Sequence, residues 1–304
     1  MDNNNKLKFL LFGGNGWIGS KVYTQLVNMG YNVLKSNCRA NDYNSVENEI
    51  TDIKPTHVMS FIGRTHGIYD GNEISTIDYL EMPGKLVENI NDNLYGPVVL
   101  ASICNKMNCH FTYLGTGCIF DYDNEHIFGD TTTGFKEEDK PNFFGSAYSI
   151  VKGYTDKLMH DLYDKTALNV RIRMPITNEY INRNFITKIT NYKKICSIPN
   201  SMTVLDELIP VMINYAVDKK IGTINLTNPG LISHNEILEM YKEIVDPSFS
   251  WENFSIEEQD KILTSKRSNN CLNTNTLENN TKFKVKNIKD SVKDILIEMK
   301  HNIK

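Results

Sequence analysis

Short apolar runs alternate with amphipathic stretches over the first half of the chain. The short apolar run 8–12 ("KFLLF") is typical of a buried strand, a further strand is expected at 110–115 ("HFTYLG"), and residues 147–165 are expected to form a helix. The other elements expected from the same pattern are strands at 32–36, in the residues leading to Gly63 and at 168–176, and helices at about 20–31, 45–53 and 95–107. Strands that alternate with helices in this way predict a parallel sheet with helices on both faces.

The alternation weakens after about Pro175, where loops rich in asparagine and lysine join shorter helices. We therefore expect residues 1–175 to form a Rossmann-type, doubly wound α/β domain that binds a dinucleotide and carries the catalytic residues. Residues 176–304 are expected to form a smaller substrate-binding lobe over the carboxyl edge of the sheet, where ligands bind in such folds, with some elements returning to the first domain.

Composition narrows the class of protein. Of the 304 residues, 40% are hydrophobic and 23% charged, as in ordinary globular proteins, and the formal charge of −4 gives no reason to expect nucleic acid or a membrane as a partner. No signal peptide is visible, and no run approaches the roughly 20 apolar residues of a membrane helix. Six scattered cysteines without a C-x-x-C pair argue against zinc and against disulfides, so we expect a cytoplasmic protein without a metal.

A glycine-rich loop, "GGNGWIG", follows the first strand and opens a helix. Glycines at such a turn let the backbone approach a pyrophosphate, which then lies at the helix N-terminus. The second strand ends without an acidic residue and continues "SNCR", so Arg39 is predicted to meet a 2′-phosphate and to favour NADPH over NADH, unless it is only a solvated side chain. The full set of expected cofactor contacts is Gly13, Asn15, Gly16, Trp17, Ile18, Gly19, Arg39, Phe61, Ile62, Gly63, Tyr148, Lys152, Met174 and Pro175.

The stretch "YSIVK" places Tyr148 and Lys152 four residues apart on one helix face. An ammonium beside a phenol favours the phenolate and is expected to lower the tyrosine pKa toward neutrality. Thr116, in "LGT", is expected to end a strand in the same crevice. Such a threonine, tyrosine and lysine beside a dinucleotide loop form the arrangement of short-chain dehydrogenases/reductases.

With these residues in place, the chain resembles extended short-chain dehydrogenases/reductases of the dTDP-4-dehydrorhamnose reductase branch. More closely, it resembles the bifunctional nucleotide-rhamnose synthases, which are 3,5-epimerases and 4-reductases. The resemblance covers about residues 8–275 and is carried by "GGNGWIG", "KPTHV", "TGCIFDYD", "GFKEEDKPNFFGSAYSIVK", "RIRMPI", "RNFITKI", "IPNSMTVLDELIP", "NLTNPGLISHNEILEMYKE" and "RSNNCLN". One stretch departs from the family: "IGRTHGIYDGNE" replaces its usual loop after the third strand.

The resemblance implies that the chain converts UDP-4-keto-6-deoxyglucose to UDP-L-rhamnose with NADPH. No dehydratase domain is visible, so the substrate is expected from a separate 4,6-dehydratase. The choice of UDP over dTDP rests on the resemblance alone. The family often dimerises through helices beside the catalytic one, which makes a homodimer an open expectation.

Cys118 is the residue on which the second activity depends. Without a family, a cysteine at a strand end is best interpreted as a small buried hydrophobic residue. Epimerase-reductases, however, place this cysteine and a lysine in the pocket, and the matching lysine is Lys188. The resemblance therefore implies that Cys118 is the base of epimerisation and Lys188 its acid partner, although Lys188 could also be solvated or contact a phosphate.

The resemblance also suggests a substrate side. Arg267 is our choice for the diphosphate, because arginine suits bidentate phosphate contacts. Asn93 matches an asparagine that orders the catalytic region, and a purely structural role is equally compatible with its position. The expected substrate contacts are Asn93, Arg183, Asn184, Asn200, Ser201, Met202, Arg267 and Asn270.

Two other functions share most of these residues. A reductase that acts on an already epimerised sugar needs all of them except Cys118 and Lys188. A catalytically silent NADP-binding regulatory subunit has no need of Thr116, Tyr148 and Lys152 together, and their presence argues against it.

Overall fold

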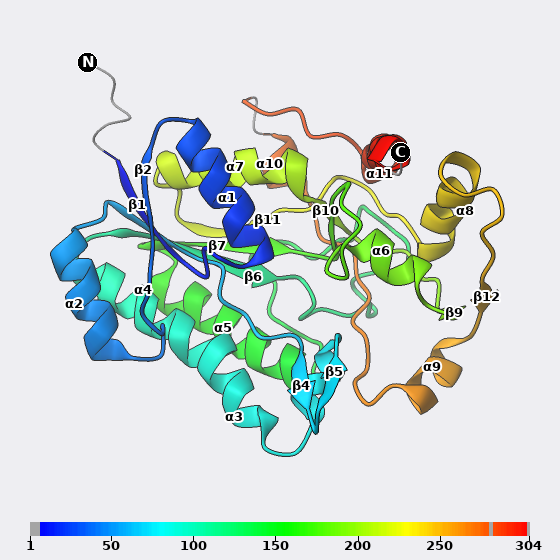
Figure 1. The fold of residues 1–304 in the computed structure, drawn as a ribbon, viewed down its shortest axis with the longest axis horizontal. Coiled ribbons are helices and arrows are strands. Elements are labelled where there is room, and N and C mark those ends of the chain that lie inside the picture. The colour runs from blue at the N-terminus through cyan, green and yellow to red at the C-terminus, as the bar shows by residue number, and fades with distance from the viewer. Residues whose placement is uncertain (1–6, 280–281, 303–304) are drawn as a thin grey trace.

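The computed structural model describes residues 7–279 and 282–302, and its centre is a six-stranded parallel sheet (Figure 1). The strands lie in the order β2-β1-β3-β6-β7-β11. Their bounds are Lys8–Phe12 (β1), Asn32–Lys35 (β2), His57–Ser60 (β3), His110–Thr116 (β6), Ala167–Ile172 (β7) and Gly222–Asn225 (β11). The expected Rossmann-type sheet is confirmed.

The strand order reverses at β1. From β1 the chain moves to one side to form β2 and then crosses to the other side to form β3, and both strands pair with β1 in parallel. Ligands of doubly wound sheets bind outside the carboxyl ends of the strands at this switch point. The loops that follow β1, β3 and β6 meet there, and they carry the glycine loop, the 61–64 segment and Thr116.

Helices cover both faces of the sheet, and each face has its own apolar core. On one face, α1 and α7 pack over β1, β7 and β11; on the other, α2, α4 and α5 pack over β1, β3 and β6. The two layers are visible on either side of the sheet in Figure 1. The helices run Trp17–Asn28 (α1), Tyr43–Ile53 (α2), Gly96–Lys106 (α4), Ala147–Tyr163 (α5) and Leu205–Val217 (α7).

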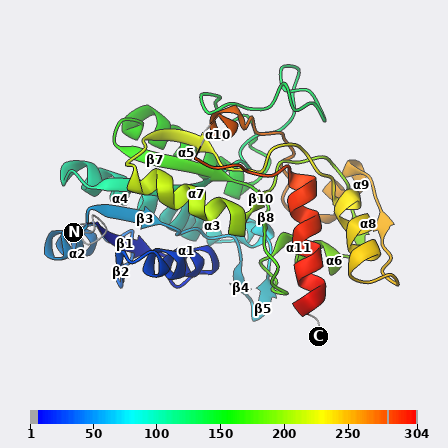
Figure 2. The same cartoon turned by 90° about the horizontal axis from the view of Figure 1, so that it is seen from above.

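The smaller lobe has a third apolar core at one end of the sheet (Figure 2). It is built mainly from α6 (Phe185–Thr190), α8 (His234–Ile244) and α11 (Ile288–Asn302). Its short parallel pairs are β8 (Pro175–Ile176) with β10 (Thr203–Val204), and β9 (Lys194–Ile195) with β12 (Glu252–Asn253). The remaining helices after the sheet are α9 (Ile256–Ile262) and α10 (Asn275–Glu278). Because β11 and α7 return to the sheet, the lobe is not a continuous piece of chain.

The segment between β3 and α4 has the most structure that the sequence pattern did not predict. It contains an antiparallel hairpin, β4 (Gly67–Tyr69) and β5 (Asn72–Ile74), and then the short 3-10 helix η2 (Ile77–Glu81). After these come α3 (Lys85–Ile90) and one turn of π-helix, η3 (Asn91–Tyr95), which runs directly into α4. Most of the hairpin lies in residues 62–73, the stretch in which the sequence departs from the family it resembles.

Two expected boundaries were wrong. The first helix begins at Trp17 rather than near residue 20, because Gly16 already serves as its N-cap. The strand expected at 168–176 divides at Met174, whose backbone adopts φ of 40°, a left-handed conformation that interrupts a strand. Residues 175–176 then pair with β10 of the lobe instead of extending β7.

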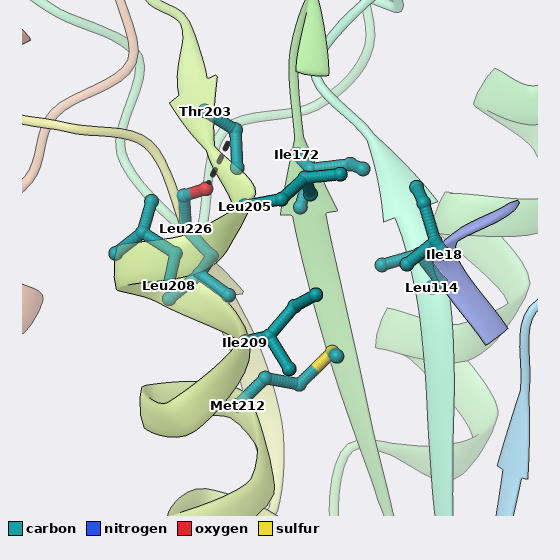
Figure 3. A pocket seen from close by; sticks show the side chains of 9 residues that line it. All are labelled: Ile18, Leu114, Ile172, Thr203, Leu205, Leu208, Ile209, Met212 and Leu226. Atoms are coloured by element: carbon teal, nitrogen blue, oxygen red, sulfur yellow. Dashed lines mark hydrogen bonds between the residues drawn. The ribbon is translucent and has the colours of Figure 1, made fainter. Parts of the chain in front are cut away.

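A small cavity of about 10 Å³ lies under α7, between that helix and the sheet (Figure 3). Leu208, Ile209 and Met212 of α7 face Leu114 and Ile172 across it. Its polar wall residue, Thr203, donates its hydroxyl proton to the Leu226 carbonyl oxygen at 2.9 Å. The cavity is a gap in the packing of the core, with room for about one water molecule, and not a ligand site.

Within the described ranges, no helix is long and apolar enough to span a bilayer.

Candidate active site

The glycine loop leaves the first turn of α1 open. Gly16 is the N-cap and provides no side-chain hydrogen bond, and no acidic side chain lies in the first turn, so the helix N-terminus is free to receive an anion. Gly13 has φ of 74°, and a Cβ there would lie 2.9 Å from the Phe61 carbonyl carbon. A Cβ on Gly19 would lie 2.2 Å from the Gly13 oxygen. The loop therefore fits the pyrophosphate of a dinucleotide in the way that its sequence predicts.

Other predicted cofactor residues surround this loop. Phe61 continues the pairing of β3 by donating its N–H to the Phe12 oxygen at 2.9 Å, which holds the 61–63 segment against the glycine loop. Trp17 donates its indole N–H to Glu179 at 2.9 Å and so ties α1 to the lobe. The strained backbone at Met174 marks the point where the chain leaves β7 for the lobe. Cofactor contact by these residues stays a prediction.

Thr116, Cys118, Tyr148 and Lys152 form what we call the catalytic cluster. Thr116 ends β6, and its hydroxyl oxygen accepts the Cys118 N–H at 3.0 Å and lies in hydrogen-bonding contact with Tyr148. Cys118 is close enough to influence the ionisation of both Tyr148 and Lys152. The fold thus brings together four of the five residues that the sequence predicts to be catalytic.

The Lys152 ammonium is directed at a residue that the sequence analysis missed. It donates to the Tyr113 hydroxyl at 2.5 Å and to the Leu114 carbonyl oxygen at 3.5 Å, and its side chain is only 4% exposed. Burial lowers the pKa of Lys152 to about 8, although Asp156 and Cys118 oppose that shift. Tyr113 lies on β6, three residues before Thr116, and its ring also lies beneath the ammonium.

The pKa of Tyr148 shifts in the direction opposite to the one expected from the sequence. Burial raises it and the neighbouring Cys118 raises it further, while the hydrogen bond with Thr116 lowers it only in part. The reason is that the Lys152 ammonium points at Tyr113 and the Leu114 carbonyl. At neutral pH, Tyr148 is therefore a phenol that can donate a proton.

A buried arginine fixes the turn that presents Cys118. Arg173 donates to the Gly117 oxygen at 3.2 Å and to the Asn200 side-chain oxygen at 2.6 Å. Leu272 and Arg173 pack so closely on Gly117 that a Cβ there would lie 2.7 Å from Leu272. The sequence "TGC" is explained by this contact, because a larger residue before Cys118 would displace the turn.

His66, Arg183, Lys188 and Arg267 form what we call the cationic cluster. Lys188 lies on α6, and its pKa is lowered by burial and then by the charges of Arg183 and Arg267. An Arg183 nitrogen lies 3.3 Å from His66 Nε2. A guanidinium can only donate, so His66 Nε2 must accept this hydrogen bond. The imidazole of His66 is therefore neutral. Burial, Arg183 and Lys188 accordingly lower its pKa. Such a concentration of positive charge suits an anionic ligand.

Most of the other predicted substrate residues are buried parts of the scaffold. Asn184 caps α6, and the Asn200 oxygen accepts from Arg173 and from the Asn270 N–H. Ser201 accepts the Leu272 N–H at 2.9 Å. The predicted residues with at most 1% exposure are Asn93, Asn184, Asn200, Ser201, Met202 and Asn270. Their hydrogen bonds explain a structural role, and substrate contact by them stays a prediction.

Asn93 and Arg39 both act on the segment after β3. Asn93, in η3, accepts the Arg64 N–H at 3.0 Å and donates to the Arg64 oxygen at 2.9 Å, so it orders this loop. Arg39 is 72% exposed and pairs with Asp92 at 3.3 Å, beside Arg64. Its guanidinium is accessible after β2, where a ribose phosphate is expected.

In the described part of the chain, no group of His, Cys, Asp and Glu side chains could hold a metal ion.

Residues 9–184 match the family model described as the NAD dependent epimerase/dehydratase family. A protein of Acanthamoeba polyphaga mimivirus is 58% identical over 272 residues, which cover 90% of this chain and 92% of that protein. The crystal structure of the UDP-rhamnose synthase of the same virus superposes with a TM-score of 0.90 at 55% identity, covering 96% of this chain and 99% of that one.

Two relatives come from Arabidopsis thaliana. The bifunctional dTDP-4-dehydrorhamnose 3,5-epimerase/dTDP-4-dehydrorhamnose reductase is 41% identical over 93% of this chain and 90% of its own length. A trifunctional UDP-glucose 4,6-dehydratase/UDP-4-keto-6-deoxy-D-glucose 3,5-epimerase/UDP-4-keto-L-rhamnose-reductase is 43% identical over 87% of this chain. That match covers 38% of the larger protein.

Proposed function

The chain belongs to the NAD dependent epimerase/dehydratase family, and from that premise we propose that it makes UDP-L-rhamnose. Its substrate is UDP-4-keto-6-deoxyglucose, whose C3 and C5 it inverts before it reduces the C4 ketone with NADPH. The observation that carries the proposal is the position of Cys118 beside Tyr148 and Lys152. A proton acceptor for epimerisation and the proton donor for reduction then share one pocket.

Reduction needs a proton donor at O4. NADPH, when bound at the glycine loop, supplies the hydride to C4. Tyr148 is a phenol at neutral pH and gives its proton to the oxygen, which Thr116 holds through a second hydrogen bond. Below about pH 8 Lys152 is charged, and its ammonium, which donates to the Tyr113 hydroxyl, places a positive charge in the same cluster as Tyr148.

Epimerisation needs an acid and a base on opposite faces of the sugar. The C3 and C5 hydrogens are acidic because both carbons flank the C4 ketone. In each inversion the Cys118 thiolate takes the proton from carbon, and the electrons of that C–H bond move onto O4, where Tyr148 and Thr116 stabilise the enolate. Lys188 then protonates the same carbon from the other face. Solvent removes the proton from Cys118 and returns one to Lys188 before the next inversion.

The neighbours of Lys188 make it a proton donor. Arg183 and Arg267 repel the ammonium charge, so Lys188 gives up a proton more readily than a solvated lysine does. The same arginines provide the donors for a diphosphate, and Arg267 remains our choice for it. UDP as the nucleotide rests on the names of the mimiviral synthase and the trifunctional Arabidopsis enzyme.

The 4-keto-6-deoxy sugar must come from a 4,6-dehydratase, an activity that the trifunctional Arabidopsis enzyme's name includes. We propose that a separate dehydratase supplies it here.

The six cysteines are free thiols, which suits the reducing conditions of the cytoplasm.

Product analysis tests the function directly. The protein is incubated with UDP-4-keto-6-deoxyglucose and NADPH, and the product sugar is identified by NMR. We expect NADPH oxidation and UDP-L-rhamnose. A reduced sugar that keeps the original configuration at C3 and C5 would leave only a reductase, and a lack of NADPH oxidation would overturn the proposal altogether.

A further inference from the structure

The helix η2 supplies two carboxylates, Asp78 and Glu81, to parts of the chain that lie far away in sequence. Both contact the segment 264–268, which leaves α9 and is orange in Figure 1. The helix η2 follows shortly after residues 62–73, the stretch in which the sequence departs from the family it resembles. Nothing in the glycine loop or in the catalytic cluster accounts for these two acids.

Asp78 holds Arg267 directly and also holds Ser265, which in turn contacts Arg267. One Asp78 oxygen accepts from an Arg267 nitrogen at 2.5 Å, and the other accepts the Ser265 N–H at 2.9 Å. A second Arg267 nitrogen donates to the Ser265 oxygen at 2.7 Å. Because two of its nitrogens are bound, the guanidinium cannot rotate freely. The ion pair is largely shielded, with side-chain exposures of 26% for Arg267 and 13% for Asp78.

The charge on Asp78 is maintained by these contacts. Burial alone would raise the pKa of its carboxyl, but hydrogen bonds from Arg267, Thr76 and the Ser265 N–H outweigh burial and lower the pKa. Asp78 is therefore ionised at neutral pH. The positive charge of Arg267 also acts on Lys188 and on Tyr192, which places it between η2 and the lobe.

Glu81 connects the same segment to the catalytic helix. One of its oxygens accepts the Ala147 N–H at 2.6 Å and the Ser265 hydroxyl proton at 3.2 Å. Ala147 begins α5 and directly precedes Tyr148. Hydrogen bonds therefore run from Arg267 through Asp78, Ser265 and Glu81 to the turn that presents the catalytic tyrosine.

We propose that Asp78 is a positioning residue, which fixes the Arg267 guanidinium for the diphosphate of the nucleotide sugar. The assignment of the diphosphate to Arg267 rests on the proposed function. Arg267 then meets its ligand already oriented, and the ligand does not lose affinity by ordering a long side chain. In this proposal the effect of Asp78 on the diphosphate is exerted through Arg267.

A double-mutant cycle tests this role, with Asp78→Asn, Arg267→Ala and the double variant. The measured quantities are KM and kcat for UDP-4-keto-6-deoxyglucose, and the dissociation constant of UDP by calorimetry. We expect Asp78→Asn to weaken UDP binding and to raise KM about tenfold, the effect of losing roughly 1.4 kcal/mol of binding free energy. We expect kcat and NADPH affinity to change little. Once Arg267 is alanine, Asp78→Asn should add nothing.

Asp70→Asn is the matched control, since Asp70 lies at the exposed tip of the β4–β5 hairpin and undergoes the same chemical change. Equal losses from Asp78→Asn with and without Arg267 would show a merely structural role and overturn the proposal. Unchanged KM and UDP affinity in Asp78→Asn would overturn it as well. If the 4-keto sugar is not turned over but the cycle holds for UDP, the positioning role stands and the proposed function falls.

Discussion

Two lysines, Lys152 and Lys188, differ in the way their surroundings treat their charge. Burial lowers the pKa of both. Around Lys152, however, Asp156 and Cys118 raise the pKa again, whereas around Lys188 two arginines lower it further. The catalytic cluster therefore retains a charge that the fold itself supports. The cationic cluster lacks this support, and its uncompensated positive charge suits an anionic ligand.

This difference suits the two clusters to different parts of the proposed reaction. In the catalytic cluster the partners are fixed by short hydrogen bonds inside the sheet core, as between Lys152 and Tyr113. In the cationic cluster, a diphosphate near Arg183 and Arg267 would offset the repulsion on Lys188 and return its pKa toward the ordinary value. Binding of the nucleotide sugar would then favour the protonated form of Lys188, the acid proposed for epimerisation.

The largest effect is expected from the catalytic cluster. Tyr148→Phe removes the proton donor at O4 but leaves the glycine loop unchanged. We expect the rate of NADPH oxidation to fall about 10²–10⁴-fold, the usual contribution of a general acid. Cofactor affinity, measured by NADPH fluorescence titration, should change far less than this rate, because the glycine loop is intact. Reduction near the wild-type rate would assign proton donation to another group.

A comparable loss, restricted to epimerisation, is expected when one residue of either cluster, Cys118 or Lys188, is removed. Cys118→Ala and Lys188→Ala each remove one partner of the acid–base pair, so deuterium exchange from D₂O into C3 and C5 should fall about 10²-fold or more. Exchange requires enolisation but no hydride. Each variant should still reduce UDP-4-keto-L-rhamnose, which is already epimerised. Exchange at the wild-type rate in Cys118→Ala would make the cysteine a packing residue only.

The predictable part of this site was local in sequence. The glycine spacing and the four-residue separation of Tyr148 and Lys152 follow from helix and turn geometry, and the fold confirmed the elements that carry them. Tyr113 was missed because its contact with Lys152 spans 39 residues and depends on the packing of α5 against β6. The expected lowering of the Tyr148 pKa was wrong for the same reason, since the direction of the ammonium is a tertiary property.

The lobe also contains features that local sequence could not predict, because they depend on distant parts of the chain. The four-residue strand β11 returns to the sheet from within residues 176–304, and its sequence, GTIN, has only one large apolar residue and so resembles the surrounding loops. The roles of Asp78 and Glu81 depend on contacts across more than 180 residues with Ser265. The periodic patterns that reveal helices and strands span only a few residues, so they cannot predict contacts at that separation. The sequence predicts that the asparagines at 184, 200 and 270 contact the substrate. The structure shows that their side chains make hydrogen bonds within the scaffold.

A smaller effect is expected from the partner of Lys152. Tyr113→Phe removes an oxygen that accepts from the ammonium, so the charged form loses support and the pKa of Lys152 falls below about 8. In the wild type, kcat/KM for reduction should decline as pH rises through about 8, because Lys152 then loses its proton. In the variant, this decline should begin about one pH unit lower, as the loss of a charged hydrogen bond implies. Thermal unfolding provides the control, and an unshifted profile in a folded variant would contradict this role.

The smallest effect is expected outside both clusters, at Arg39. Its side chain is 72% exposed and pairs with Asp92, so it loses little on leaving that partner for a ribose 2′-phosphate. Because the contact remains solvated, we expect Arg39→Ala to reduce the preference for NADPH over NADH by only about tenfold. This preference is measured from the dissociation constants of NADPH and NADH, determined by titration at two salt concentrations. In the wild type, salt should weaken NADPH binding more than NADH binding, and Arg39→Ala should reduce that difference. An unchanged preference would place the 2′-phosphate away from Arg39, and equal affinities in the wild type would contradict NADPH selectivity itself.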